Sequence, residues 1–291
     1  SDKMKKILIT GKDSYIGKSV EKWLMREPDK YEVDTIDMKD NIWRKENFSK
    51  FDVVFHVAGI AHVSSDPKLE GLYYKVNRDL AIDTAEKAKA EGVVQFIFMS
   101  SIIVYGDSSS SKRIIDINSV PTPSNFYGNS KLQAEEGIKC LETDEFKIVI
   151  LRPPMIYGKG SKGNYPKLSR AAKKLPIFPN IYNERSMLHI DNLCEFIKLM
   201  IDNEEKGLFF PQNAEYVNTS DMVKLIAKAH GRNIRLVKVF NPVLRLMLGR
   251  AGVINKMFGN LVYDKSMSEY DKANYRIRDF NESIELTEKQ S

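Results

Sequence analysis

Tyr127 and Lys131 are the two side chains in this sequence best suited, by type and spacing, to move a proton. They stand four residues apart in residues 124–141, a segment with helical apolar spacing, so both project from one face of the predicted helix. An ammonium group beside a phenol lowers the pKa of the phenol from about 10 toward neutrality, which makes it a usable general acid or base. Ser101 ends an apolar run upstream, and its hydroxyl is predicted to hold a substrate oxygen beside Tyr127. The three residues predict proton transfer at a hydroxyl or carbonyl group.

A glycine-containing turn, residues 11–17, lies between a predicted strand at 6–10 and a predicted helix at 15–26. Exposed backbone N–H groups and the helix dipole favour a pyrophosphate at such a turn. Ser14 stands where a dinucleotide-binding turn has its middle glycine, and its Cβ narrows the approach of the backbone to the phosphate. The turn therefore predicts a dinucleotide site of slightly altered shape.

An acidic residue at the expected distance supports this interpretation. Asp37 follows the apolar run 33–36 and stands about 20 residues beyond the turn, where a carboxylate accepts hydrogen bonds from the ribose hydroxyls of a dinucleotide. The carboxylate would repel a 2′-phosphate, so Asp37 favours NAD over NADP. Lys39 is close enough to keep NADP open as the alternative cofactor.

Alternating strands and helices must position these residues. The runs are apolar throughout rather than at every second position, which is typical of a parallel sheet covered on both faces. We predict an α/β fold, a Rossmann-type doubly wound parallel sheet with a smaller α/β substrate lobe near the C-terminus. The further strands are predicted at 53–57, 95–99 and 147–151, and the further helices at 72–91, 164–174, 191–203 and 219–230. The predicted domains are 4–157, a Rossmann-type domain that also receives about 187–211, and an interwoven substrate-binding lobe made of 158–186 and 212–291.

Composition bounds the class of protein. Of the 291 residues 42% are hydrophobic and 29% charged, a globular balance, and no apolar stretch approaches the length of a membrane-spanning helix. The start lacks the apolar run of a signal peptide, so we expect a cytoplasmic protein. The two cysteines and four histidines show no metal-ligand spacing, and we expect no metal. No RNA-binding motif accompanies the aromatic residues, and we expect no nucleic acid as partner.

Basic residues are concentrated in one part of the chain. The net charge is 45 − 39 = +6, and residues 231–260 carry six Lys and Arg without any Asp or Glu. Within this part, residues 234–258 mix basic side chains with leucines, valines and methionines. The mixture is typical of a lid over a substrate, and it also suits a helix in peripheral contact with an anionic membrane. Both interpretations stay open.

With these motifs in place, the chain resembles the extended short-chain dehydrogenase/reductases, the NAD-dependent nucleotide-sugar epimerase/dehydratase family. The resemblance covers residues 5 to about 230 and includes Phe55-His56-Val57-Ala58-Gly59 and Leu151-Arg152-Pro153-Pro154-Met155-Ile156-Tyr157-Gly158. It implies Ser101, Tyr127 and Lys131 as catalytic residues, and Asn164 and Arg185, with Ser101, as substrate-binding residues. The cofactor-binding residues that the motifs and the resemblance give are Gly11, Ser14, Tyr15, Ile16, Gly17, Asp37, Asn41, Ile42, Val57, Ala58, Gly59, Asn77, Ser100, Lys131 and Pro153.

One departure from the family narrows the chemistry. Sugar dehydratases of this family carry an Asp-Glu pair directly after the catalytic Ser or Thr, because elimination of water needs an additional acid and base. Ile102 and Ile103 occupy these places, which argues against dehydration. The residues at the motif positions are most similar to those of capsule-locus UDP-4-keto-6-deoxy-HexNAc 4-reductases and UDP-sugar 4-epimerases.

The resemblance therefore implies an NAD(P)-dependent oxidoreductase acting at C4 of a UDP-sugar in surface polysaccharide biosynthesis. A 4-keto-sugar reductase and a UDP-glucose/UDP-GlcNAc-type 4-epimerase would use the same residues. Two alternatives are an epimerase of a lipid-diphosphate-linked sugar and a dinucleotide-sensing regulator without catalysis. The sequence leaves the oligomeric state open, and a homodimer is among the possibilities.

Overall fold

The computed structural model describes residues 3–60, 64–250 and 252–290, and the chain divides into two compact units. The first unit comprises the described parts of 1–106, 121–153 and 193–210. The second comprises those of 107–120, 154–192 and 211–291. The chain passes between the units several times, so neither is a continuous piece of sequence.

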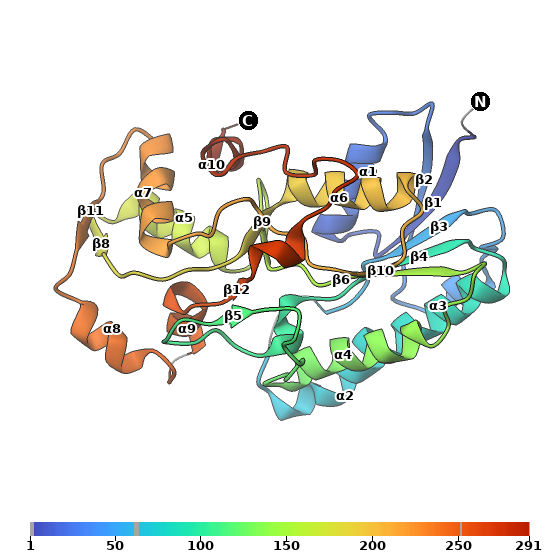
Figure 1. Cartoon of the computed structure of the whole chain (residues 1–291), viewed down its shortest axis with the longest axis horizontal. Helices are drawn as coiled ribbons and strands as arrows, with labels where there is room; N and C mark the ends of the chain where they lie inside the picture. The colour runs from blue at the N-terminus through green and yellow to red at the C-terminus, as the bar shows by residue number, and fades with distance from the viewer. Residues whose placement is uncertain (1–2, 61–63, 251, 291) are drawn as a thin grey trace. The chain divides into compact units, whose positions relative to one another are not determined.

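A six-stranded sheet forms the centre of the first unit, and all of its strand pairs are parallel (Figure 1). Its spatial order is β2-β1-β3-β4-β6-β10. The strands are β1 (Lys5–Thr10), β2 (Tyr31–Ile36), β3 (Val53–His56), β4 (Gln95–Met99), β6 (Lys147–Leu151) and β10 (Gly207–Phe209). The order reverses between β1 and β3, and ligands of such sheets bind outside the carboxyl ends of the strands at this point. The predicted α/β class with a Rossmann-type parallel sheet is confirmed.

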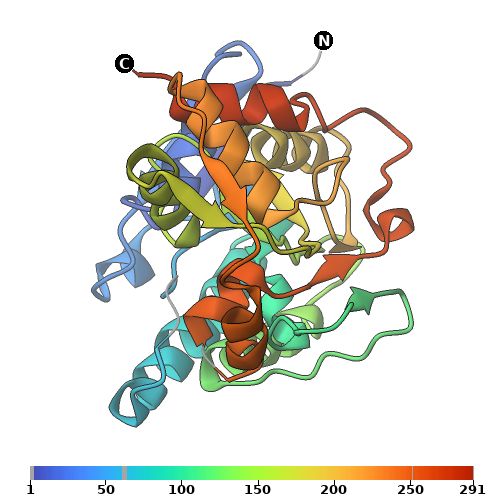
Figure 2. The same cartoon turned by 90° about the vertical axis from the view of Figure 1, so that its left-hand side faces the viewer.

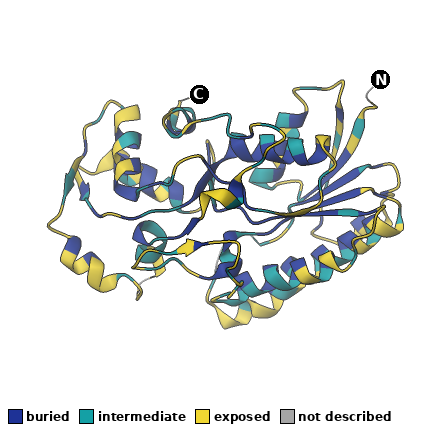
Figure 3. Ribbon diagram, viewed as in Figure 1, coloured by how far each residue is buried: buried dark blue, intermediate teal, exposed yellow. Residues whose placement is uncertain are grey.

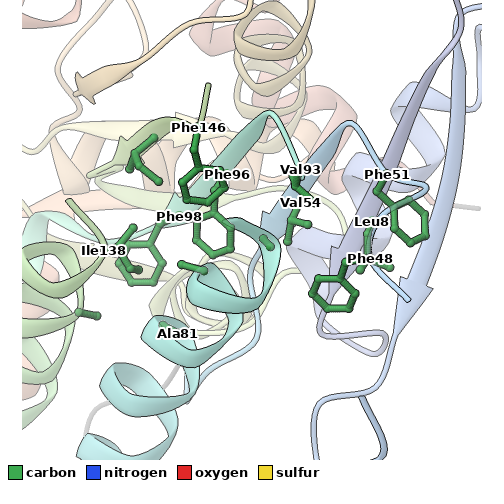
Figure 4. Packing of buried hydrophobic residues seen from close by; sticks show 14 of the residues in the cluster. Leu8, Phe48, Phe51, Val54, Ala81, Val93, Phe96, Phe98, Ile138 and Phe146 are labelled. Carbon is green, nitrogen blue, oxygen red and sulfur yellow. The ribbon is translucent and has the colours of Figure 1, made fainter. Parts of the chain in front are cut away.

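Helices cover both faces of this sheet, as the apolar strands require. The helices of the first unit are α1 (Tyr15–Leu24), α2 (Glu70–Tyr73), α3 (Leu80–Ala90), α4 (Phe126–Lys139) and the later part of α6 (Ile190–Asp202). Alanines of α3 and α4 pack with Phe96 and Phe98 of β4 in the core on one face (Figure 4). On the other face α1 and α6 are tied by a hydrogen bond from Trp23 Nε1 to Glu195 Oε2 at 3.1 Å.

The link from β2 to β3 is short and leaves β2 at the edge of the sheet. It holds one 3₁₀ turn, η1 (Ile42–Lys45), and no further strand. Trp43, Phe48 and Phe51 from this link are buried in the core, so the link itself covers the edge of the sheet. The strands of this six-stranded sheet follow one another in space as they do along the chain, except that β2 lies on the outer side of β1.

The second unit consists of small paired strands and short helices (Figure 2). Its parallel pairs are β7 (Met155–Tyr157) with β9 (Met187–His189), β8 (Ile177–Pro179) with β11 (Arg235–Val237), and β5 (Ile114–Ile115) with β12 (Val262–Tyr263). Its helices are α5 (Asn164–Lys174), α7 (Thr219–Ala229), α8 (Asn241–Met247), α9 (Gly252–Phe258) and α10 (Phe280–Glu288). Buried side chains from these elements form a core of their own. Among the residues that the structure describes, no helix is long and apolar enough to cross a membrane.

Candidate active site

Tyr127 lies in the first turn of α4 and is almost completely buried. Asn125 begins the helix, since its side chain accepts a hydrogen bond from Gly128 N at 2.9 Å. The ring of Tyr73 meets the Tyr127 ring edge-on, with centroids 5.9 Å apart. Burial and the neighbouring Tyr73 raise the pKa of Tyr127 to about 12. The phenol is therefore protonated at neutral pH in this structure.

Ser101 lies at the carboxyl end of β4 and begins a 3₁₀ turn, η4 (Ile102–Tyr105). Its Oγ accepts a hydrogen bond from Ile103 N at 3.1 Å, which leaves its own O–H proton available to a substrate oxygen. Gly128 fixes α4 against this turn, because a Cβ at position 128 would lie 2.8 Å from the Ile103 carbonyl oxygen. The close approach brings the start of α4, and with it Tyr127, to the turn that follows Ser101.

Lys131 lies one helical turn beyond Tyr127, and its ammonium group is buried. Its Nζ donates to the Met99 carbonyl at 3.2 Å and lies 3.5 Å from where a Cβ of Gly59 would be. Burial lowers the pKa of Lys131 to about 8, although Glu135 acts in the opposite direction. The sequence predicted that Lys131 lowers the pKa of Tyr127, and for this structure that is wrong. The ammonium points to Met99, and the burial of the phenol dominates.

Asn77 connects two parts of the site. It lies in a π-helical turn, η3 (Tyr74–Asp79), and is fully buried. Its Oδ1 accepts from Ile60 N at 2.8 Å, and its Nδ2 donates to Ser130 Oγ at 3.2 Å. Ser130 in turn donates to the Tyr127 carbonyl at 2.7 Å. Asn77 therefore holds the loop after β3 to the first turn of α4, where the proton-transfer residues lie.

The turn after β1 packs closely against the loop after β3 and against the start of α1. Gly11 has φ of 81°, and a Cβ there would lie 3.1 Å from the backbone of Ala58. A Cβ at Gly17 would lie 3.2 Å from the Gly11 carbonyl oxygen. Ser14, which replaces the expected middle glycine, begins α1 by accepting a hydrogen bond from Gly17 N at 3.0 Å. Tyr15 and Ile16 follow in the first turn of α1, whose positive dipole end faces the turn.

Thr10 and His56 hold the loop after β3 by hydrogen bonds, a role that sequence reasoning did not predict for either residue. Thr10 Oγ1 accepts from Val57 N at 3.2 Å and from Ala58 N at 3.4 Å. It also shares a hydrogen bond of 2.9 Å with His56 Nδ1. Burial, with a smaller contribution from Lys131, lowers the pKa of His56 to about 3, so the imidazole is neutral. The pair fixes the loop 57–59 relative to the end of β1.

The residues predicted to contact the adenosine are exposed. Asp37 follows β2, and its carboxylate accepts from Lys39 N at 2.9 Å. Asn41 accepts from Arg44 Nε at 3.3 Å, and the Ile42 side chain is 64% exposed. A cavity of about 540 Å³ runs along β2, and Asp37 is among the residues that line it. Lys12 of the turn also lines this cavity, whereas Asn41 and Ile42 do not. The backbone N–H groups of the turn 11–17 and the carboxylate of Asp37 are group types that suit a dinucleotide.

A buried ion pair beneath the site was missed by sequence reasoning. Arg152 Nη2 lies 2.7 Å from Glu135 Oε1, and its Nη1 donates to the Tyr105 hydroxyl at 2.8 Å. Ser100 donates a hydrogen bond to the same carboxylate. Ile102 N donates to the Pro153 carbonyl at 2.9 Å, which joins the end of β4 to the segment after β6. Glu135 stands four residues beyond Lys131, so its position on the same helical face was the one available signal.

Of the residues predicted to bind substrate, Asn164 and Arg185 lie in the second unit and Ser101 in the first. Asn164 is the first residue of α5. Arg185 Nη1 donates to the carbonyls of Asn255 and Gly259, each at 3.2 Å. Its Nε is buried and has no hydrogen-bond partner among the described residues, and burial lowers the pKa of Arg185 to about 10. The guanidinium therefore retains a donor for an anionic ligand.

Comparison with known proteins identifies the family. The model of the NAD dependent epimerase/dehydratase family matches residues 7–209, which include the nucleotide turn and the Ser101, Tyr127 and Lys131 site. The chain belongs to this family. It is therefore an enzyme, and the predicted NAD cofactor is confirmed.

Two curated relatives carry informative names. The chain is 29% identical over 273 residues to a UDP-glucose 4-epimerase of Vibrio cholerae, covering 89% of this chain and 82% of that protein. It is 32% identical over 221 residues to an N-acetyl-α-D-glucosaminyl-diphospho-ditrans,octacis-undecaprenol 4-epimerase of Escherichia coli O157:H7. That match covers 73% of this chain and 64% of the relative.

Solved structures with the same fold are more distant in sequence. A dTDP-4-dehydrorhamnose reductase from Clostridium acetobutylicum has a TM-score of 0.74 at 19% identity, covering 97% of this chain and 98% of that one. A UDP-glucuronic acid 4-epimerase from Bacillus cereus, in complex with NAD, has a TM-score of 0.73 at 18% identity, covering 97% and 96%. At this identity the likeness shows the fold alone.

Proposed function

We propose that this enzyme is a 4-epimerase of a UDP-linked sugar. The observation that carries the proposal is the end of β4, where Ser101, an available hydroxyl donor, lies against the start of α4 with the buried Tyr127 and Lys131. Ile102 and Ile103 follow Ser101 directly and offer no acid or base for elimination. The Vibrio cholerae relative, which matches 89% of the chain, is named for the same reaction.

Each residue has a defined part in such a reaction. Bound NAD would supply reversible hydride transfer at C4 of the sugar. Tyr127 acts in its phenolate form, accepts the proton of the C4 hydroxyl as the C4–H bond breaks, and gives the proton back to the C4 oxygen when the bond reforms. Ser101 donates its hydroxyl proton to the same oxygen and orients it. Return of the hydride to the opposite face of the keto sugar inverts C4, and no electrons are lost overall.

Lys131 and Arg185 have binding roles in this proposal. The ammonium of Lys131 lies beside Gly59 and is placed to hold the nicotinamide ribose. Proton abstraction requires the phenolate form of Tyr127, which burial disfavours, so the positive charge of bound NAD would have to favour it. Arg185, with a buried donor left over, is suited to the diphosphate of the nucleotide sugar.

The test is product analysis without added reductant. Incubation of the purified protein with UDP-glucose and with UDP-GlcNAc should yield the C4 epimer of one of them, detected by proton NMR, and native mass spectrometry should show retained NAD. A protein that is empty of NAD and only reduces a 4-keto sugar at the expense of NADH would contradict epimerisation and establish a 4-keto-sugar reductase.

A second candidate is the same chemistry on a sugar linked through a diphosphate to a polyprenyl lipid. The Escherichia coli relative, 32% identical over 73% of this chain, is named for such a substrate. We further propose a role in the synthesis of surface polysaccharides, which the family resemblance implies. Epimerisation of a lipid-linked GlcNAc, with no turnover of UDP-sugars, would establish the second candidate and contradict the first.

A further inference from the structure

A helical segment of the second unit exposes apolar side chains to solvent. The segment, residues 238–250 and 252–256, contains α8 and most of α9 and is called the basic helical segment here. Val243 and Leu246 are 61% and 67% exposed, and Figure 3 shows that most of α8 is exposed. Within α8 the exposed residues Val243, Leu246 and Met247 recur at intervals of three and four, which places them in one stripe along the helix. Val239 and Phe240, just before α8, are exposed as well.

This stripe is a second apolar face, because the opposite face of α8 is already packed. Leu244 and Phe258 are buried in the core of the second unit, and Leu248 packs against that core. Asn241 is buried and donates from Nδ2 to the Asn180 carbonyl at 2.9 Å. The segment is therefore anchored through one face, and its outward stripe has no structural task within the unit.

The charges around the stripe have a single sign. Residues 231–260 contain six basic residues and no acidic one, and of these Lys238, Arg245 and Arg250 are exposed in the basic helical segment. Arg232 donates from Nη2 to the Leu175 carbonyl at 3.1 Å. This contact joins Arg232 to the end of α5, where Lys173 and Lys174 are exposed. A partner for this surface must be apolar inside and negatively charged at its edge.

We infer that the basic helical segment docks on the surface of an anionic lipid bilayer. An apolar helix face sinks into the boundary between headgroups and acyl chains, while Lys and Arg around it bind acidic headgroups. Each basic residue near such a surface raises binding about fivefold at moderate salt. A soluble acidic protein would satisfy the charges but would leave Val243 and Leu246 in water, so the bilayer satisfies both properties.

The same segment borders the arginine assigned above to the diphosphate. Arg185 Nη1 donates to the carbonyl oxygens of Asn255 in α9 and of Gly259 just after it. A docked segment would therefore bring a diphosphate-binding residue close to the headgroup layer, where a lipid-linked sugar carries its diphosphate. This consequence rests on the proposed function, whereas bilayer binding itself does not.

The charge part is tested by sedimentation of the full chain with vesicles. We expect binding to vesicles of phosphatidylcholine with phosphatidylglycerol, weaker binding at high salt, and little binding to phosphatidylcholine alone. Arg245→Glu with Arg250→Glu should weaken binding by at least about 25-fold, from two lost basic residues alone. The matched control is Lys22→Glu with Lys89→Glu, which replaces two exposed basic residues outside the segment. Both double variants have the same net charge, +6 − 4 = +2. The control should bind the vesicles as the native chain does.

The apolar part needs a second pair of variants. Val243→Ser with Leu246→Ser should weaken binding to the acidic vesicles, whereas Ile117→Ser with Val120→Ser, which changes residues that are 75% and 74% exposed, should not. The inference would be refuted if both pairs of variants lost the same amount of vesicle binding. It would also be refuted if binding of the native chain did not depend on salt concentration or on the charge of the lipid. Analytical ultracentrifugation without vesicles showing a dimer that only the first pair dissociates would refute it as well, since the stripe would then bind a second copy. Tyr127→Phe should bind vesicles normally, which separates this outcome from any failure of the proposed function.

Discussion

The two ends of the dinucleotide site differ in burial, and the difference separates chemistry from selection. At the catalytic end Tyr127, Lys131 and Asn77 are buried and joined to neighbours by hydrogen bonds. At the adenosine end Asp37 and Asn41 are exposed, and Asp37 bonds only locally to Lys39 N among the contacts described. Proton transfer needs donors and acceptors held in a fixed geometry away from water, whereas an exposed charge that selects a cofactor acts through solvent and is screened by salt.

The largest effect is expected at the buried phenol. Tyr127→Phe removes the group that accepts and returns the proton, and general acid–base groups contribute about 10²–10⁴-fold to turnover. We expect kcat to fall by at least about 100-fold while the Kd for NAD changes by no more than a few-fold, measured by product NMR and by titration. Tyr182→Phe makes the same chemical change at an exposed phenol and should leave both quantities unchanged. Retention of a tenth of the activity would remove Tyr127 from this role.

The buried ion pair should dominate stability at the catalytic end. Arg152→Met leaves the buried carboxylate of Glu135 without its cation, which costs about 3–5 kcal/mol of unfolding free energy. Arg44→Met breaks an exposed pair of similar length, 2.8 Å to Asp83, and should cost less than about 1 kcal/mol. Urea unfolding of both variants measures the contrast. Equal losses of unfolding free energy in the two variants would mean that burial does not determine how much these ion pairs contribute to stability.

A combined replacement sharpens the same point. Glu135→Gln together with Arg152→Met removes both charges and should recover part of the loss seen for Arg152→Met alone. If the double variant loses more unfolding free energy than the two single variants lose together, the pair contributes packing rather than charge compensation.

Burial of Lys131 should make stability depend on pH. Its pKa of about 8 in the folded chain lies below the 10.5 of an exposed lysine, so the unfolded chain binds more protons between these values and stability rises with pH across them. Below pH 8 the burial costs about 3 kcal/mol, since a tenfold change in a protonation equilibrium is worth about 1.4 kcal/mol. Lys131→Met should therefore be more stable than the native chain at pH 7, and the difference should shrink as the pH approaches 10.5.

Thermal unfolding of the two proteins without cofactor from pH 7 to pH 10 measures this trend. Lys139→Met, at the exposed end of the same helix, serves as the control and should show no such convergence with the native chain. A constant gap between Lys131→Met and the native chain would show that Lys131 is charged and solvated in the folded protein.

Local spacing explains which parts of the site were readable in the sequence. The turn 11–17, Asp37 and the Tyr127–Lys131 pair each depend on residues close in the chain and on a predicted strand or helix. By contrast, Arg152 meets a carboxylate 17 residues away, and Thr10 meets a histidine 46 residues away. These separations do not predict a contact, because the residues meet only when the folded sheet brings the strand ends together.

The pKa of Tyr127 failed as a prediction for the same reason. Helical spacing correctly places Lys131 one turn from the phenol, but it contains no information on what surrounds the pair. Tyr73, from a separate helix, covers the phenol, and the Met99 carbonyl at the end of β4 takes the ammonium. Burial by these distant segments outweighs the i,i+4 relation.

The smallest effect is expected at the exposed end. Asp37→Ser removes the charge that repels a 2′-phosphate and weakens the hydrogen bonds to the ribose hydroxyls, so the ratio of NAD to NADP affinity should fall. Because the carboxylate is exposed, the change should be about tenfold or less, from the modest energies of solvent-screened charges. Asp40→Ser alters the same charge three residues away and should leave the ratio unchanged. Titration of both variants with NAD and NADP measures the two ratios. If the native protein already prefers NADP, Asp37 does not select the cofactor, and Lys39→Ala should then lower NADP affinity, because its ammonium would be the group that binds the phosphate.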